Sequence, residues 1–170
     1  MAIRCGHCGI NVAGIPIQAD NESEWFRCPE CKKGLVLDRP TGLVYPSAPA
    51  GSPVKQLPAD VEGAWREVRV AYAASAYTAA EMMCRKILMH LAVDVAGSKA
   101  GKQFAEYVTA LDAAGYIPTG LKPVVDQVRQ RGNGANHELD ASTMEDSLTT
   151  LHITEHLLKS IYELPSLKTP

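Results

Sequence analysis

The sequence carries little net charge, and its basic residues are not concentrated in either part of the chain. Its 170 residues include 17 Lys and Arg against 19 Asp and Glu, a formal charge of −2. Five basic and five acidic residues precede Tyr45, and twelve basic and fourteen acidic residues follow it. This balance excludes a polycationic domain, so any contact with nucleic acid must depend on a local group of basic side chains.

Long apolar runs and a secretory leader are also lacking. No apolar run approaches the roughly 20 residues that a membrane-spanning helix needs. The first ten residues, MAIRCGHCGI, have neither the basic region nor the long apolar region of a signal peptide. We therefore expect a cytoplasmic protein without a membrane segment, in which thiols stay reduced and bind metal more readily than they pair.

Cysteine is scarce, but four of the five cysteines form two C-x-x-C pairs. Cys5 and Cys8 make the first pair, Cys28 and Cys31 make the second, and 19 residues separate the two pairs. Each pair offers two thiolates from one tight turn, and two such turns close a tetrahedral site around a single ion. Four protein ligands leave no open position for water, so the spacing predicts one structural Zn²⁺ per chain rather than a catalytic metal.

The residues around the cysteines suit a small β unit. Strands are expected at 10–17, 24–27, 35–37 and 43–45, with a turn at 39–42. This pattern resembles a zinc ribbon over residues 1–45. A redox C-x-x-C or a disulfide is the alternative, although neither requires a second pair at this spacing. His7 could replace a cysteine as ligand, but four thiols already complete the set.

A proline-rich stretch at 46–58 divides the chain. It reads PSAPAGSPVKQLP, with four prolines among its residues. Proline at this density prevents helix formation and favours an extended, semi-rigid linker. The expected domains are therefore the ribbon at 1–45, the linker at 46–58 and a third segment at 59–165.

Apolar residues of the third segment recur at the 3- and 4-residue spacing of helices. Five helices joined by short turns are expected at about 61–72, 77–95, 103–114, 119–131 and 143–164. Asp60 is the expected cap of the first helix, Ser142 and Glu145 form a capping box for the last, and the last should end before Pro165. The second helix is apolar over more than one stripe and should be central. The predicted fold is mainly α, a five-helix bundle behind a small N-terminal β zinc ribbon.

A group of Arg, Asn and His residues follows the fourth predicted helix. Arg129 and Arg131 lie at its end, the Gly-Asn-Gly segment 132–134 is expected to end the helix, and His137 follows closely. Arginine binds phosphate through a planar fork, and histidine transfers protons near neutral pH. The pairing suits phosphodiester chemistry. It suits equally a structural helix end, in which Asn133 and His137 bond to free carbonyl groups.

Three other features have simpler interpretations. His152 and His156 enclose an H-x-x-E-H pattern typical of inverted zinc proteases, but the further ligand that this motif needs would have to come from the few residues that follow. We interpret them as histidines on a solvated or interfacial helix face. Cys84 lies on the apolar stripe of the second helix and is interpreted as a small core residue. His90 is interpreted as a boundary residue.

The segment RGNGANHE, together with the Arg85-Lys-Ile-Leu88 stretch of the second helix, resembles the HEPN superfamily of helical domains. The resemblance covers about residues 58–164. It is greatest to the uncharacterised domain attached to restriction-enzyme and helicase subunits, domain of unknown function 4145. Catalytic HEPN members are metal-independent ribonucleases that act as dimers, with an R-x(4 to 6)-H motif from each protomer at a shared cleft. The resemblance therefore implies a homodimer with the segment 129–137 near the two-fold axis.

The match to the commonest catalytic form, R-N-x-x-x-H, is uneven. Asn133 and His137 fit its asparagine and histidine, whereas Gly132 occupies the arginine position. Arg131 still satisfies the R-x(4 to 6)-H spacing. Arg129 lies where the uncharacterised family keeps its arginine.

Two functions follow as hypotheses. The first is a defence or toxin-type endoribonuclease that cleaves RNA without metal, with His137, Arg131 or Arg129, and Asn133 as its catalytic group. The second is a non-catalytic module, in which a dimeric helical bundle carries a zinc ribbon that binds protein or nucleic acid. An assay on labelled RNA distinguishes them.

Overall fold

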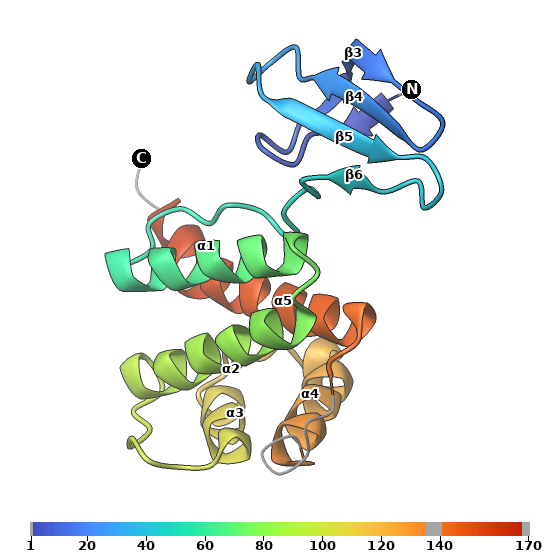
Figure 1. Cartoon of the computed structure of the whole chain (residues 1–170). Helices are drawn as coiled ribbons and strands as arrows, with labels where there is room; N and C mark the ends of the chain where they lie inside the picture. The colour runs from blue at the N-terminus through green and yellow to red at the C-terminus, as the bar shows by residue number, and fades with distance from the viewer. Residues whose placement is uncertain (1, 135–140, 168–170) are drawn as a thin grey trace. The chain divides into compact units, whose positions relative to one another are not determined.

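The computed structural model describes residues 2–134 and 141–167, with the backbone alone for 131–134. The chain divides into two compact units, Met1–Ala50 and Gly51–Pro170 (Figure 1). The first is built of strands and the second of helices. None of the helices in the described ranges is long and apolar enough to cross a lipid bilayer.

The N-terminal unit contains two antiparallel sheets. The smaller sheet pairs β1 (Ala2–Arg4) with β2 (Asn11–Ala13), and the larger has the order β3 (Ile15–Ala19), β4 (Ser23–Arg27), β5 (Gly34–Asp38) and β6 (Val44–Tyr45). Alternate residues of β4 and β5, namely Phe26, Leu35 and Leu37, are buried in the core of this unit. Two of the cysteines complete the same core, so the sheet and the cysteine cluster depend on one another.

The single strand predicted at 10–17 is wrong, because Gly14 divides it between the two sheets. A Cβ atom at Gly14 would lie 2.9 Å from Cδ1 of Phe26 and 3.0 Å from Cδ1 of Ile3, so the chain can pass this close to the core only without a side chain. Strand β1 was not predicted. Its three residues are too few to show an alternating pattern in the sequence.

The proline-rich segment contacts both units. At its start, Pro46 lies so close to Gly6 that a Cβ atom there would overlap the Pro46 carbonyl oxygen. From Gly51 onward the segment belongs to the helical unit: Ser52 accepts a hydrogen bond from Nε1 of Trp65 at 2.9 Å, and Val54 is buried. Residues 51–58 therefore pack on the helices of the second unit, where their backbone and apolar groups find partners.

Five long helices form the described part of the second unit, as the apolar spacing predicts. They are α1 (Ala59–Ala73), α2 (Tyr77–Asp94), α3 (Phe104–Ala113), α4 (Lys122–Gly134) and α5 (Met144–Leu158), with a 3₁₀ turn η1 (Thr119–Leu121), a π-helical turn η2 (Lys159–Glu163) and a short α6 (Leu164–Ser166). Helix α2 contacts α1, α3 and α5 (Figure 1). Its Cys84, Leu91 and Ala92 are fully buried, which confirms it as the central helix of this unit.

The predicted helix ends differ from the observed ones at both termini of the bundle. Pro58, rather than Asp60, occupies the N-cap of α1 and makes no side-chain cap. Thr143, rather than Ser142, caps α5 by accepting a hydrogen bond from the Asp146 N–H at 3.1 Å. Pro165 does not mark the end of helical structure, because it lies in the first turn of α6, where a missing N–H costs no helical hydrogen bond.

The prediction that segment 132–134 ends the fourth helix is also wrong. Helix α4 continues through Gly134. Glycine is permitted in a helix at a cost of about 1 kcal/mol relative to alanine. The final turn therefore stays helical although its sequence is typical of a turn.

Candidate functional site

The four paired cysteines meet at one point of the N-terminal unit. Their sulfur atoms all lie within 4.8 Å of one another, with Cys5 Sγ 3.7 Å from Cys31 Sγ and Cys8 Sγ 3.9 Å from Cys28 Sγ. A regular tetrahedron of sulfur around Zn²⁺, with Zn–S bonds of about 2.3 Å, has edges of about 3.8 Å. All five cysteines of the chain are free thiols, so the cluster is not a pair of disulfides. The arrangement could hold one metal ion.

The backbone of the two C-x-x-C turns adopts the same geometry. In the first turn the Gly9 N–H donates to the Cys5 carbonyl at 2.8 Å, and Gly9 adopts a φ of 75°. In the second turn the Lys32 N–H donates to the Cys28 carbonyl at 3.0 Å, and Lys32 adopts a φ of 63°. Both turns place a left-handed residue just after the second cysteine of the pair. The two halves of the site are thus built in the same way.

Two further contacts concern which side chains can bind the metal ion. Nε2 of His7 lies 3.1 Å from the carbonyl oxygen of Gly34, so this imidazole is already engaged by the backbone and is no fifth ligand. The backbone N–H of Cys31 stabilises the thiolate of Cys28 and lowers its pKa to about 7, although burial opposes this. Although the backbone N–H of Ile10 opposes it, burial together with the other three thiols raises the pKa of Cys8 to about 11, so a cation that binds here must displace protons from part of the cluster.

The predicted Arg, Asn and His group falls at the end of α4. Arg129 is half-exposed, and its Nη2 lies 3.0 Å from Oδ1 of Asp126. Arg131 and Asn133 belong to the last turns of the helix, and His137 lies outside the described residues. Positions 129 and 133 are one turn apart and share a helix face, whereas position 131 is rotated by about 200° from either of them. The continued helix thus separates the two arginine positions.

The surface beside Arg129 is only slightly hollowed. A cavity of about 80 Å³ lies between α3 and α4, and its lining includes Asp112, Lys122 and Arg129. Lys122 Nζ lies 2.9 Å from Asp112 Oδ1, so opposite charges line it. Ligand pockets usually enclose about 300–1,000 Å³, so this hollow by itself is too small for a nucleotide.

A buried ion pair lies beneath the helical unit's surface, and the sequence alone did not indicate it. Arg85 Nη2 lies 2.8 Å from Oε1 of Glu81 one turn earlier on α2, and only 14% of the Arg85 side chain and 2% of the Glu81 side chain are exposed. The guanidinium also lies over the ring of Phe104, 5.8 Å from its centroid. On α5, Thr150 Oγ1 donates to the same Glu81 oxygen at 3.5 Å.

The stretch 85–88, which carries part of the family resemblance, is therefore mostly enclosed. Arg85 is mostly buried, Ile87 and Leu88 belong to the core, and Lys86 points outward. The i, i+4 spacing of Glu81 and Arg85 was the available signal, because such pairs form readily on helices. The spacing could not predict that this ion pair is buried, because its burial depends on the packing of α3 and α5 against α2.

Comparison with protein families gives a match for the helical unit. Residues 66–169 match the family described as Domain of unknown function (DUF4145), which is more than half of the chain. The chain belongs to the DUF4145 family. The match begins within α1 and excludes the cysteine-bearing unit. Comparison with the curated proteins and with the solved structures gives no significant match.

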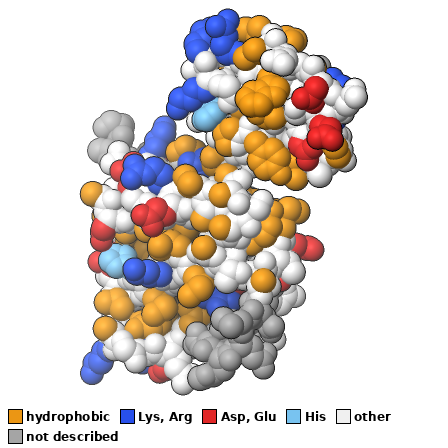
Figure 2. Space-filling view, viewed as in Figure 1, with side chains coloured by type: hydrophobic (Ala, Val, Ile, Leu, Met, Phe, Trp, Pro, Cys, Tyr) orange, Lys and Arg blue, Asp and Glu red, His pale blue; other side chains and the backbone are white. Residues whose placement is uncertain are grey.

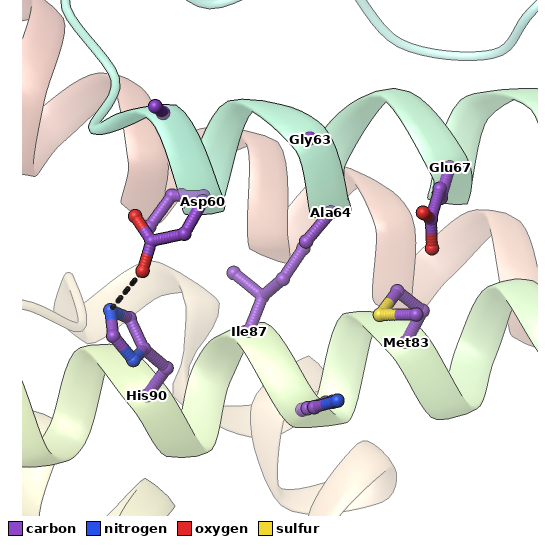
Figure 3. A pocket seen from close by; sticks show the side chains of 10 residues that line it. Asp60, Gly63, Ala64, Glu67, Met83, Ile87 and His90 are labelled. Atoms are coloured by element: carbon purple, nitrogen blue, oxygen red, sulfur yellow. Dashed lines mark ion pairs between the residues drawn. The ribbon is translucent and has the colours of Figure 1, made fainter.

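A larger hollow than the one beside Arg129 lies in the groove between α1 and α2, partly within the matched region. It encloses about 360 Å³ and is lined by small and apolar side chains, among them Gly63, Ala64 and Ile87 (Figure 3). Asp60 and His90 face one another at one end, with Oδ2 and Nε2 4.0 Å apart (Figure 3). Both side chains are well exposed, so the groove has charged edges but no desolvated polar group that could act as a catalyst.

The remaining candidates of the DUF4145 region are structural. Cys84 is fully buried, and desolvation raises the pKa of its thiol to about 12, which confirms it as an inert core residue. His152 and His156 are exposed on α5. The Glu155 between them pairs with Lys159, at 2.6 Å from Oε1 to Nζ, and its Oε2 also lies 3.7 Å from Nδ1 of His152. Among the described residues, the only group of side chains close enough to hold a metal ion is that of the four cysteines. The H-x-x-E-H pattern therefore forms no metal site in the described structure.

Proposed function

We propose that Cys5, Cys8, Cys28 and Cys31 bind one structural Zn²⁺ per chain and that the N-terminal unit is a zinc ribbon. The sulfur separations of 3.7 and 3.9 Å support this, since they match the edges of a zinc–thiolate tetrahedron. Zinc suits the site because four soft thiolates in tetrahedral geometry are a ligand set typical of it. The closed shell gives the ion a role in folding rather than catalysis.

We further propose that the helical unit is a HEPN-type endoribonuclease that acts on RNA without a metal ion. The observation that supports it best is the continuation of α4 through Gly134, which gives positions 129 and 133 a common helix face just before His137. On such a face an arginine and an asparagine can contact one phosphate together. This favours Arg129 over Arg131 as the arginine that binds the phosphate.

The proposed reaction is transesterification. His137 removes the proton of the ribose 2′-OH, the 2′-oxygen attacks phosphorus, and the bond from phosphorus to the 5′-oxygen breaks. The leaving 5′-oxygen takes a proton from a histidine, so the products are a 2′,3′-cyclic phosphate and a 5′-hydroxyl. Arg129 stabilises the charged phosphorane, and Asn133 orients the phosphate.

The proposed site would be formed by residues of two protomers. The hollow beside Arg129 is too small for a nucleotide on its own, which fits a cleft completed by a second protomer. Two copies would also supply two histidines, one to accept the proton and one to donate it. The homodimer is thus part of the proposal.

A cleavage assay on matched strands tests this function. Purified protein is incubated with end-labelled RNA and with DNA of the same sequence, in EDTA, and the product ends are analysed. We expect the RNA to be cut to 2′,3′-cyclic ends and the DNA to stay intact, because only RNA carries the 2′-OH nucleophile. Cleavage of DNA, or cleavage that requires added metal, would contradict the mechanism.

A non-catalytic binding module is the second candidate. The contact that favours it is the Arg129–Asp126 ion pair, since an arginine already neutralised at 3.0 Å is less available to a phosphate. The absence of cleavage by protein that contains zinc and is fully folded would select this function.

A further inference from the structure

The larger sheet of the N-terminal unit exposes a row of aromatic and apolar side chains that its own fold does not bury. Trp25 on β4 pairs in register with Val36 on β5, and Val36 pairs with Tyr45 on β6. In a sheet, residues in one row point to the same face. Neighbouring strands lie about 4.8 Å apart, so the row from Trp25 to Tyr45 spans about 10 Å.

This row lies on the face opposite the core. Phe26, Leu35 and Leu37, which alternate with it, are buried, whereas Trp25 is 51% exposed and Tyr45 is 47% exposed. Ile17, which lies in the irregular register between β3 and β4, is exposed beside the row. The exposed parts of Trp25, Tyr45 and Ile17 thus lie together on one face rather than scattered singly, and such contiguous apolar surface is typical of a binding site.

A cationic side chain lies on the same strand as Trp25. Arg27 lies two residues from Trp25 on the same strand and is exposed, and it has no ion-pair partner among the residues that the structure describes. Three acidic groups toward the other end of the strands make local contacts: Glu24 pairs with Arg39 at 3.3 Å, Asp20 accepts the N–H of Ser23 at 2.6 Å, and Asp38 accepts the hydroxyl of Thr41. Figure 2 shows hydrophobic side chains on this unit, with most of the visible Lys and Arg on one side and the visible Asp and Glu on the other.

The shape and charge of this face favour nucleic acid over protein as its ligand. Protein partners usually need about 800 Å² of interface on each side, far more than one row of three side chains provides. Stacked bases of a single strand need only exposed rings and a nearby cation, and at about 3.4 Å per step roughly three bases fit along 10 Å.

We propose that this face, which we call the Trp25 face, binds single-stranded nucleic acid by stacking bases on Trp25 and Tyr45 while Arg27 contacts a phosphate. Because π-stacking does not distinguish ribose from deoxyribose, the Trp25 face accepts any single strand. The inference extends the proposed function, since it gives the N-terminal unit the task of holding RNA for the helical unit.

The chain contains two tryptophans, which makes the test direct. Trp65 is only 2% exposed, so a change of intrinsic fluorescence on adding a ligand reports on Trp25. The full-length, zinc-loaded protein is titrated with a 12-nucleotide oligodeoxyuridylate, which lacks the 2′-OH and cannot be cleaved by the proposed mechanism. We expect saturable quenching of fluorescence, together with a rise in anisotropy of a labelled copy of the strand.

Substitutions then locate the contact. Trp25→Ala should weaken binding by about 5- to 150-fold, which corresponds to roughly 1–3 kcal/mol for one stacked base. Trp25→Phe keeps a ring and should bind within about threefold of the parent while losing the fluorescence change. Ile10→Ala removes an exposed apolar side chain outside the larger sheet and is the matched control, with no expected effect. Tyr45→Ala serves as the second variant if Trp25→Ala lacks a full equivalent of zinc.

Equal affinity of the parent, Trp25→Ala and Tyr45→Ala proteins would overturn the Trp25 face, as would the absence of binding. The strand used here is not a substrate, so the result is independent of catalysis. Binding without any cleavage of RNA in the separate assay would refute the ribonuclease and leave the Trp25 face standing. Cleavage of RNA without binding of this strand would refute the Trp25 face and leave the ribonuclease proposal standing.

Discussion

At the scale of single residues, the chemistry of a side chain was easier to predict than its surroundings. Cys84 was expected in the core and is buried there. Arg85 was noted only as part of a stretch that resembles a family, and its enclosure with Glu81 between α2, α3 and α5 was not predicted. Spacing along one helix fixes which residues are neighbours on that helix. It does not fix which face another helix covers, so burial of a charge becomes visible only in the assembled unit.

The buried pair gives a prediction for stability. Glu81→Ala leaves the Arg85 guanidinium enclosed without its carboxylate, and breaking a buried pair costs about 3–5 kcal/mol. We expect a loss of that size in the free energy of unfolding, measured by urea denaturation. Lys86→Ala, on the same helix but on its outer side, is the control and should change stability by less than about 0.5 kcal/mol. Similar midpoints for the two variants would mean that the pair is not enclosed as described.

Glu155 gives a prediction for pH. Burial disfavours its charge, but hydrogen bonds from Lys159 and Ser52 more than offset this and hold the pKa of the Glu155 carboxyl below its usual range. A lowered carboxyl pKa contributes stability above the unfolded-state pKa of about 4.3, and this stability is lost as the pH falls through the folded-state pKa. Glu155→Gln should therefore destabilise the protein at pH 7, and the difference from the parent should shrink below about pH 4. A constant difference between pH 7 and pH 3 would contradict the ion pair.

At the scale of elements, the apolar spacing located every long helix, and the two C-x-x-C pairs located the cysteine cluster. Short elements and element ends were harder. Gly14 breaks a strand because of a close approach to Phe26, and Gly132 to Gly134 stay helical. Glycine is compatible with a turn, a break or a helix, and the choice depends on neighbours that are distant in the sequence. Residues 51–58 likewise were predicted only as part of a semi-rigid linker, and their packing on the helices depends on residues that are distant in the sequence.

The cysteine cluster should decide whether the N-terminal unit folds. Cys28→Ser removes one of four ligands and a buried core residue, and a unit this small has little other core. We expect zinc per chain to fall well below the one equivalent of the parent protein, and residues 1–45 to lose dispersed amide signals in NMR spectra. The helical circular dichroism of the second unit should persist. Cys84→Ser, a buried thiol outside the cluster, should keep its zinc; equal zinc content in the parent and Cys28→Ser proteins would refute the four-thiolate site.

At the scale of the whole molecule, two compact units are joined by a segment that contacts each of them, and the DUF4145 match covers the helical one. The composite site requires two chains. Light scattering at micromolar concentration should give about twice the chain mass of 18.3 kDa. A monomer across that range would exclude a shared cleft, because the hollow that the described residues of one chain form beside Arg129 is too small for a nucleotide.

The central claim is that the end of α4 is a catalytic site, and the RNA cleavage rate of His137→Ala tests it most directly. The variant is purified alongside the parent and alongside Arg129→Ala and Arg131→Ala, and all are assayed in EDTA on the same labelled RNA. We expect His137→Ala to cleave RNA about 10²- to 10⁴-fold more slowly than the parent protein, as for the loss of a general acid or base. Arg129→Ala should be more damaging than Arg131→Ala, because position 129 shares its helix face with Asn133. Equal cleavage by the parent and the His137→Ala protein would contradict the account and identify the activity as a contaminant.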